Sequence, residues 1–484
     1  MVLIENAYLA PVVGPEITSG YIRIEGDRIV EVAAGPAPEA PGATRIDGTG
    51  CLATPGLVNT HHHLYQWASQ GLAQDATLFE WLVALYPVWA AMDADVVKGA
   101  ATAGLGHLAL SGCTTSSDHH YVFPKGRGDL FAAEIEAARE LGIRFHPARG
   151  SMDRGQSKGG LPPDVVVERL DEILTATAEA VGAYHDPSFS SKLRVAVAPC
   201  SPFSASAELM TETAALARSE GVRLHTHLAE TVDEEEHCRA QFGARPAAYL
   251  DKLGWLGPDV WVAHAVHLSD ADIDRFAATG TGTAHCPSSN GRLGAGIARV
   301  SEMLRRGANV GLGVDGSASS ELTALAGEMR QALLFQRARY GPTALTARQA
   351  LELATMGGAR NLGRQDELGS LEAGKLADIA LWRMDGPFAS AVADPVFALA
   401  LASGQPPLAR LLVGGETIVE DDELRTVAQD EAGRAGAQAH RRLLRLAEQH
   451  GVTREPTPPD REPKPPAPSA RRSTPPIDEG RVLP

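Results

Sequence analysis

Short apolar runs alternate with longer amphipathic stretches through the middle of the chain, from about residue 52 to residue 361. The stretches between the runs, such as residues 130–142 and 206–221, have the apolar spacing of helices. Strands that alternate with helices predict parallel βαβ units, and eight such units close into a TIM-like (β/α)8 barrel. The eight predicted strands are CLATPGLVN, GCTTSSDHH, GIRFHPARG, LRVAVAP, VRLHTHLAE, VWVAHAV, TGTAHCP and NVGLGVDG.

The two ends of the chain share a different pattern, with short alternating strands separated by turn residues. YIRIEGDRIVEVAAG shows it early, and KLADIALWRMD and ARLLVGGETIVEDDELR show it late. We therefore predict a discontinuous small β-sandwich domain from residues 1–53 and 365–425, around a barrel at residues 54–364. A C-terminal helix is expected at residues 426–452. Residues 453–484 are Pro-rich and charged, which predicts a disordered tail.

Composition narrows the class of partner. The chain of 484 residues has 60 acidic and 44 basic residues and a formal net charge of −16. This charge argues against a nucleic-acid backbone or an anionic membrane as partner. Five scattered cysteines without a Cys-x-x-Cys pair, no signal-peptide pattern and no long apolar run predict a soluble cytoplasmic protein. A homo-oligomer is compatible with the sequence, which does not fix the oligomeric state.

Several predicted strands end in residues that can bind a metal ion or transfer a proton. In a (β/α)8 barrel the C-terminal ends of the strands form the rim on which active sites are built. A set of such residues at one rim therefore indicates a site. The residues are His61, His63, His225, His227, Glu230, His264, His267 and Asp315.

The three consecutive histidines at residues 61–63 divide into a pair and a single residue. Because side chains alternate along a strand, His61 and His63 point the same way and His62 points the opposite way. If the pair faces the barrel interior, two imidazoles lie side by side at distances suited to one zinc ion, about 2.0–2.1 Å each. His62 is then expected to pack between the barrel and a helix.

The polar residues at the ends of the fifth and eighth strands also have alternative roles. His225 and His227 are two residues apart, and we predict that His227, nearer the rim, is the third ligand. Glu230 then provides a carboxylate over the metal, whereas His225 supports a ligand or belongs to the core. Asp315 follows an apolar strand, where burial is costly unless a cation or a hydrogen bond compensates; a solvated loop position is the alternative.

These motifs resemble the amidohydrolase superfamily, specifically its mononuclear deaminase branch. The matching strings are PGLVNTHHH, HLAE, AHAVHL, HCPSSN, GVDG and GSLEAGKLADIALW, and the resemblance covers roughly residues 1–425. It implies one divalent metal ion, most simply Zn²⁺ with Fe²⁺ as the alternative. The ligands implied by the resemblance are His61, His63, His227 and Asp315.

The same resemblance implies roles for the other rim residues. Glu230 would be the proton shuttle, Asp315 would accept a proton from the attacking water, and His264 would contact that water or the substrate. His267 stays structural in this pattern. No lysine ends the fourth strand, which disfavours the two-metal type.

The substrate is expected to be a purine or related small heterocycle. HHHLYQ, GLAQDATLFEWLVALYPVW and ARGSMDRGQSKGGLPPD resemble bacterial 8-oxoguanine deaminases, which implies conversion of the free base to urate and ammonia.

Gln66 is expected to bind the purine edge, or else to terminate the loop. Arg149 and His119 are candidate substrate contacts, with a structural salt bridge and a core position as their respective alternatives. Isoxanthopterin, guanine and s-triazines remain alternative substrates, and a scaffold without catalysis is the alternative outside the enzymes.

Overall fold

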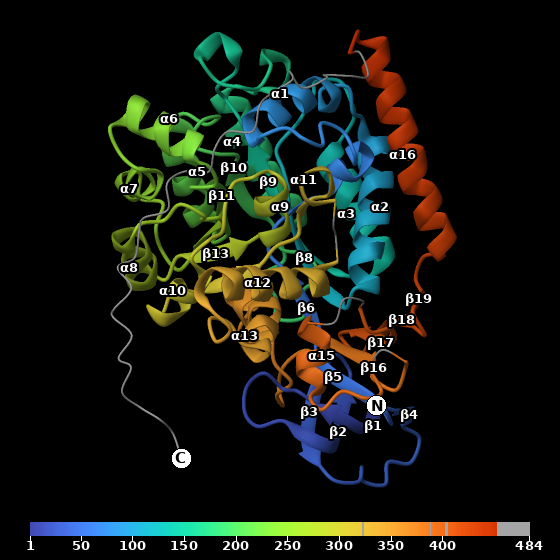
Figure 1. Cartoon of the computed structure of the whole chain (residues 1–484). Helices are drawn as coiled ribbons and strands as arrows, with labels where there is room; N and C mark the ends of the chain where they lie inside the picture. The colour runs from blue at the N-terminus through green and yellow to red at the C-terminus, as the bar shows by residue number, and fades with distance from the viewer. Residues whose placement is uncertain (322–323, 388, 402–404, 453–484) are drawn as a thin grey trace, which may run out of the picture.

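The computed structural model describes residues 1–321, 324–387, 389–401 and 405–452. Figure 1 shows a barrel wrapped by helices, with a sheet at one end that contains the N-terminus. Residues 453–484, for which the sequence predicts a disordered tail, lie outside the described residues.

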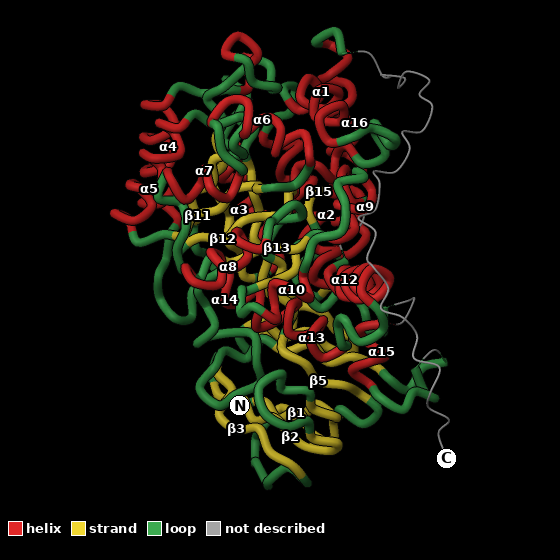
Figure 2. The backbone as a smooth tube through the Cα atoms, turned by 60° about the vertical axis from the view of Figure 1, so that its left-hand side comes forward, coloured by secondary structure: helices red, strands yellow, loops and turns green. Residues whose placement is uncertain are grey.

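Eight parallel strands form the barrel, as the alternating pattern predicts. They run in chain order around the sheet, from β6 through β8–β13 to β14. Figure 2 shows these strands inside a layer of helices. Apolar side chains such as Val58, Ala148 and Trp261 pack together within the barrel. The strands are β6 (Leu57–Asn59), β8 (Cys113–His120), β9 (Arg144–Ser151), β10 (Ala196–Pro199), β11 (Arg223–Leu228), β12 (Val260–His264), β13 (Gly282–His285) and β14 (Val310–Leu312).

The first and last barrel strands meet just beyond their hydrogen-bonded sheet. Thr60 N donates to Leu312 O at 2.9 Å, and the Thr60 hydroxyl donates to the same oxygen at 2.7 Å. The next residues continue as a short parallel pair, β7 (His62–His63) with β15 (Asp315–Gly316). This contact places the polar ends of the first and eighth strands side by side.

The helices pack their apolar faces on the outside of the barrel. The predicted helices at 130–142 and 206–221 are α3 and α5, which begin after side-chain caps from Asp129 and Ser206. The main helices are α1 (Leu78–Trp89), α2 (Ala94–Leu110), α3 (Leu130–Leu141), α4 (Leu170–Tyr184), α5 (Ala207–Glu220), α6 (Val232–Phe242), α7 (Pro246–Lys252), α8 (Asp270–Thr279), α12 (Leu325–Tyr340) and α16 (Gln429–Gln449). Shorter helical segments are η1 (Leu64–Ser69), η2 (Gln156–Lys158), η3 (Asp164–Val166), α9 (Pro287–Arg292), α10 (Val300–Arg305), α11 (Ser317–Ser320), α13 (Ala347–Glu352), η4 (Leu353–Gly357), α14 (Gly358–Asn361) and α15 (Pro395–Leu401).

The second domain is built from both chain ends, and its nine strands form one hydrogen-bonded sheet. Eight of them follow the order β19-β18-β17-β16-β5-β1-β2-β3, and β4 pairs with β1. These strands are β1 (Val2–Leu9), β2 (Ile17–Glu25), β3 (Arg28–Ala34), β4 (Thr44–Asp47), β5 (Cys51–Pro55), β16 (Ile379–Arg383), β17 (Leu408–Val413), β18 (Glu416–Glu420) and β19 (Glu423–Leu424).

The single strand predicted over residues 51–59 is wrong, because the structure divides it at Gly56. β5 belongs to the small sheet, where it pairs with β1 and β16, and β6 belongs to the barrel. Gly56 packs so tightly on Thr114 that a Cβ atom would lie 2.2 Å from the threonine side chain. The chain therefore passes from one domain to the other through a residue that must lack a side chain.

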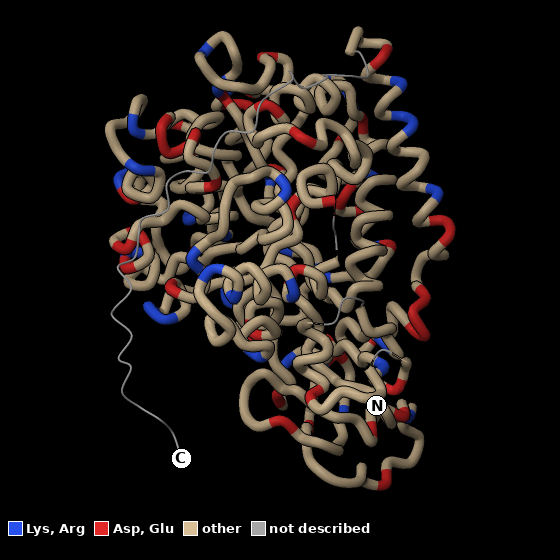
Figure 3. The backbone as a smooth tube through the Cα atoms, viewed as in Figure 1, with Lys and Arg blue, Asp and Glu red and all other residues tan. Residues whose placement is uncertain are grey.

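Neither the distribution of charged residues nor the apolarity of the helices changes this description of the fold. Figure 3 shows acidic and basic positions interspersed along the described chain, with both kinds on α16. Among the described residues, no helix is both long enough and apolar enough to cross a bilayer.

A buried ion pair joins the barrel to the small sheet. Arg144 in β9 forms two hydrogen bonds of 2.8 and 2.9 Å with Asp378, the residue before β16. Their side chains are 1% and 3% exposed, respectively. Asp378 also accepts a hydrogen bond of 2.8 Å from Gly414 N.

We expect Asp378→Asn to lower the free energy of unfolding by about 3–5 kcal/mol, because it leaves the Arg144 charge buried without its counterion. Urea denaturation followed by circular dichroism measures the change. The matched control is Glu416→Gln, which removes an exposed pair with Lys192 across the same two domains. It should cost at most about 1 kcal/mol. Equal effects of the two substitutions would contradict the importance of burial.

Candidate active site

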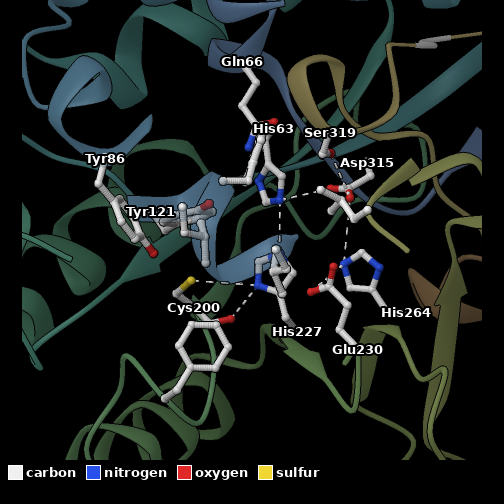
Figure 4. A pocket seen from close by; sticks show the side chains of 15 residues that line it. His63, Gln66, Tyr86, Tyr121, Cys200, His227, Glu230, His264, Asp315 and Ser319 are labelled. Carbon is white, nitrogen blue, oxygen red and sulfur yellow. Dashed lines mark hydrogen bonds and ion pairs between the residues drawn. The ribbon is translucent and has the colours of Figure 1, made fainter. Parts of the chain in front are cut away.

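The polar residues at the strand ends meet in one buried cluster. Nε2 of His61 and Nε2 of His63 each lie 3.3 Å from Asp315 Oδ1. His63 Nε2 lies 3.1 Å from His227 Nε2. Figure 4 shows His63, His227 and Asp315 directed toward one another, with Glu230 and His264 beside them. The structure thus brings together the four residues that the resemblance implies as ligands.

Hydrogen bonds behind the cluster fix the proton positions of its first histidine. His225 Nδ1 lies 2.9 Å from the carbonyl oxygen of Trp261 and must donate to it, so its Nε2 carries a lone pair. That Nε2 lies 2.8 Å from His61 Nδ1, which therefore donates to it. The lone pair of His61 is left on Nε2, which is fully buried and without a hydrogen-bond partner among the described residues. His225 thus supports a ligand, which is one of the two positions predicted for it.

The other two histidines are oriented in the same way by carbonyl oxygens. His63 Nδ1 donates to His119 O at 2.7 Å, and His227 Nδ1 donates to Cys200 O at 2.6 Å. Both lone pairs therefore lie on Nε2, on the side of Asp315. A backbone acceptor behind each imidazole is the usual arrangement for metal-binding histidines, because it fixes the tautomer and the ring orientation.

The distances fit a metal site. A tetrahedral centre with metal–ligand distances of about 2.0–2.1 Å places its ligand atoms about 3.3 Å apart. Three of the six distances among these four side chains, 3.3, 3.3 and 3.1 Å, match that spacing, and ligand atoms of His61, His63 and Asp315 all lie within 4.8 Å of one another. Three imidazole lone pairs and one carboxylate oxygen, all buried, would repel one another without a cation between them.

The second carboxylate oxygen of Asp315 is bound by two hydroxyl groups. Ser289 and Ser319 donate to Oδ2 at 2.5 and 3.1 Å. Because Oδ2 is occupied in this way, Oδ1 is the oxygen that faces the histidines. Asp315 itself has a φ of 59°, a left-handed conformation that is unusual for a residue with a side chain.

Glu230 and His264 lie next to this cluster. His264 Nε2 is 3.6 Å from Glu230 Oε2 and 3.9 Å from Asp315 Oδ2. Burial, followed by the negative charges of Asp315 and Glu234, raises the pKa of Glu230 well above its usual value. Burial also lowers the pKa of His264, whose Nδ1 hydrogen-bonds Asn290 Oδ1 at 3.0 Å. A protonated Glu230 beside a neutral His264 can act as a general acid.

A pocket opens over the cluster and is lined mainly by aromatic and aliphatic side chains. Gln66 lies at one side of it, and Glu230 and His264 lie at the other, as Figure 4 shows. Among the described residues that line the pocket there is no lysine or arginine. The other lining residues include Leu78, Trp81, Leu82, Tyr86, Tyr121, Cys200, Phe203 and Leu293.

The carboxamide of Gln66 packs directly against Gly316. A Cβ atom on residue 316 would lie 1.7 Å from Gln66 Oε1, so only glycine leaves room for the amide. The backbone of Gly316 has an ordinary extended conformation, with φ −67° and ψ 141°. The glycine of the GVDG string is therefore required by contact with Gln66 rather than by backbone conformation.

Two of the candidate substrate contacts do not line the pocket. Arg149 forms two hydrogen bonds with Glu168, at 2.8 and 2.7 Å, and its guanidinium lies over the Phe123 ring. The salt-bridge alternative therefore describes Arg149. His119 lies beneath the cluster, stacked on His227 at a ring distance of 4.8 Å, and its Nε2 donates to Ala198 O. A core position is the better description of His119.

His62 and His267 lie outside the cluster. His62 points away from Asp315, with its ring near Gly104 of α2, and its Nδ1 accepts a hydrogen bond from His63 N. His267 Nε2 donates to Ala295 O at 2.8 Å, outside the cluster.

Sequence reasoning missed Ser289, Ser319 and Glu234, which contact Asp315 or the backbone of Glu230. Ser289 falls within the HCPSSN string, so a signal for it existed. Glu234 lies four residues after Glu230, a spacing that by itself does not reveal a contact. Among the aromatic pocket residues, Trp81 and Tyr86 fall within the GLAQDATLFEWLVALYPVW string, so a signal existed for them, whereas Tyr121 and Phe203 had none.

Comparisons with known proteins agree with this geometry. The model of the amidohydrolase family matches residues 52–418. The chain is 44% identical to 8-oxoguanine deaminase from Pseudomonas aeruginosa, over 83% of this chain and 90% of that protein. It is 39% identical to an isoxanthopterin deaminase from an unknown prokaryotic organism, over 88% and 92%.

A solved structure of another protein has a similar fold. Atrazine chlorohydrolase from Arthrobacter aurescens, determined with zinc, superposes with a TM-score of 0.86 and 34% identity, covering 92% of this chain and all of that one. The fold and the cluster of histidines with an aspartate agree with the family match over most of the sequence. The chain therefore belongs to the amidohydrolase family.

Proposed function

We propose that the protein catalyses the hydrolytic deamination of 8-oxoguanine, as the free base, to urate and ammonia. The observation that carries the proposal is the pocket itself, where Gln66 faces Glu230 and His264 across the buried cluster. The similarity to 8-oxoguanine deaminase at 44% identity supports the choice of substrate.

One divalent ion, most simply Zn²⁺, is proposed to bind His61, His63, His227 and Asp315. Three imidazoles and a carboxylate suit zinc, and Fe²⁺ accepts the same ligand set. When bound, such an ion lowers the pKa of a water molecule from 15.7 to about 7, which supplies a nucleophile at neutral pH.

The side chains around the ion divide the proton transfers between them. Asp315 accepts a proton from the attacking water. Glu230, whose pKa burial raises well above its usual value, donates its proton to the ring nitrogen, accepts the second proton of the attacking water from the hydroxyl group of the adduct, and passes it to the departing amine. The proton held by Asp315 then restores Glu230. His264, 3.6 Å from Glu230, stabilises charge that develops at the carbon under attack.

Gln66 is proposed to orient the substrate. Its carboxamide offers one acceptor and two donors, which suits the alternating donors and acceptors of an oxo- and amino-substituted purine edge. Gln66 Oε1 is buried without a hydrogen-bond partner among the described residues, so an acceptor is available in the pocket. The aromatic residues that line the pocket can cover the faces of a planar ring.

Isoxanthopterin is the second candidate substrate, favoured by the relative at 39% identity. It is also a planar, oxo-substituted bicyclic ring that carries an amino group on an amidine-type carbon. The two candidates differ in ring size and therefore in the room that they need between Gln66 and the aromatic residues.

Release of ammonia from a panel of compounds tests the proposal. The panel contains 8-oxoguanine, isoxanthopterin, guanine, adenine, cytosine and a hydroxy-s-triazine, each with zinc-loaded protein. We expect the highest kcat/KM for 8-oxoguanine. A clear preference for another member would overturn the substrate, and no ammonia from any member would overturn the reaction.

His63→Ala is expected to weaken metal affinity by at least about 100-fold, since even the loss of an outer hydrogen-bond partner costs up to that much. The matched control is His62→Ala, which makes the same chemical change one residue away, on the side that faces α2. This variant should retain one equivalent of metal per chain. Metal analysis after dialysis, with circular dichroism to confirm folding, measures both. Retention of the metal by His63→Ala would refute the ligand assignment.

Gly316→Ala is expected to lower kcat/KM about 10-fold, because the new methyl group displaces the Gln66 amide and its hydrogen bonds to substrate. Stability should change little, since the side chain of Gln66 can move and the backbone of residue 316 suits alanine. Steady-state kinetics and thermal unfolding measure the two effects. Gly182→Ala is the control, because nothing lies within 4 Å of the added Cβ. Full activity of Gly316→Ala would argue against a role for Gln66.

A further inference from the structure

We propose that Glu234 is a positioning residue, which holds the carboxyl group of Glu230 in place by binding the backbone of the turn on which Glu230 lies. This inference rests on the proposed function, in which Glu230 transfers protons. It assigns a role to a buried carboxylate that, among the described residues, forms no hydrogen bond or ion pair with the proposed metal ligands.

The contact consists of two hydrogen bonds to successive amides. Glu234 Oε1 accepts from Ala229 N at 2.9 Å, and Oε2 accepts from Glu230 N at 2.8 Å. Glu234 lies in the first turn of α6 and is fully buried. Both oxygens of one side chain are therefore used to bind the two peptide groups that precede the Glu230 side chain.

The turn needs such a partner because its backbone leaves the strand. β11 ends at Leu228, and Ala229 has a φ of 51°, in the left-handed region. In this conformation the amides of Ala229 and Glu230 no longer belong to the sheet. Buried amides without a partner would each cost about 1–3 kcal/mol, so the carboxylate stabilises a turn that would otherwise relax.

The same turn is joined to the neighbouring strand end, on which His264 lies. Ala265 N donates to Leu228 O at 3.0 Å, and His267 N donates to Ala229 O at 2.9 Å. His264 and Ala265 are also left-handed, with φ values of 71° and 49°. Glu234 therefore fixes one side of a pair of turns that together set the distance of 3.6 Å between Glu230 and His264.

The geometry requires a carboxylate of this length. Glutamine would place an NH₂ group against one of the two amide N–H groups, so that two donors face each other. Aspartate is one methylene shorter and can reach only one of the amides without movement of α6. Loss of either bond should shift Glu230 while the metal ligands, on other segments or earlier in β11, remain in place.

The test compares four variants on the preferred substrate of the panel, each as full-length metal-loaded protein. They are Glu230→Gln, Glu234→Gln, the double variant, and Asp233→Asn as the matched control. Asp233 is an exposed neighbour in the same turn of α6, and its substitution removes the same charge. The measurements are kcat, KM, bound metal per chain and the midpoint of thermal unfolding.

We expect Glu234→Gln to lower kcat about 100-fold, the loss that a displacement of about 1 Å can produce, with KM changed by less than about threefold. Bound metal should stay at one equivalent, and kcat is compared per metal-loaded chain, which separates positioning from a loss of folded protein. Asp233→Asn should leave all four measurements unchanged. The double variant should be no slower than Glu230→Gln, because Glu234 acts through Glu230.

Two results separate the failure of this inference from failure of the proposed function. If Glu230→Gln loses turnover and Glu234→Gln keeps it, Glu234 has no positioning role and the proposed function stands. If Glu230→Gln keeps full turnover, the proton-transfer role of Glu230 fails, and this inference fails with it. Should Glu234→Gln not fold, Glu234→Asp decides. An intermediate loss of kcat with unchanged KM supports the inference, and unchanged kcat overturns it.

Discussion

Closure of the barrel between its first and last strands is the contact on which the site depends. Asp315 N donates to His61 O at 3.1 Å, and the short strands β7 and β15 pair directly beside it. This contact joins segments about 250 residues apart in the chain. Together with the hydrogen bonds of Thr60 to Leu312, it places the His61 and His63 imidazoles against the Asp315 carboxylate, because each segment carries only part of the ligand set. The other strands add His227 and His264 around a position that closure has already defined.

Much of this arrangement follows from local patterns in the sequence. Alternation within a strand separates His62 from the pair on either side, and the end of β11 favours His227 over His225 near the rim. In the structure His62 lies outside the cluster, His227 lies in it, and His225 lies behind His61. The direction of Arg149 could not be predicted, because its choice between the pocket and Glu168 depends on a segment 19 residues away whose fold has no periodic signal. The division of residues 51–59 was missed because both halves are buried, and they differ in their pairing partners, which are β1 and β16 for β5 and β8 for β6.

Buried carboxylates bind the backbone at three turns around the site. Asp118 accepts from Leu64 N at 2.6 Å, and Glu328 accepts from Ser288 N at 3.1 Å. Glu234 makes the two bonds described above. Each of these turns carries a residue of the pocket or a partner of Asp315, and none of them is part of a regular ladder. The chain thus uses buried carboxyl groups where the departure from strand geometry leaves amides unpaired. The contacts of Asp118 and Glu328 span 54 and 40 residues, so spacing in the sequence does not reveal them. The contact of Glu234 is local, but its spacing has no characteristic pattern.

The position of β16 between β5 and β17 has a consequence for synthesis of the protein on the ribosome. Strand β5 is complete early, but its partner β16 begins only at Ile379, after the whole barrel. At about 5–20 residues per second, the N-terminal strands wait for tens of seconds with one edge unpaired. During that interval they expose apolar surface that the finished sheet buries, and an exposed strand edge is a site of aggregation. Vectorial synthesis therefore leaves the edge of β5 unpaired for longer than it leaves the barrel open between β6 and β14.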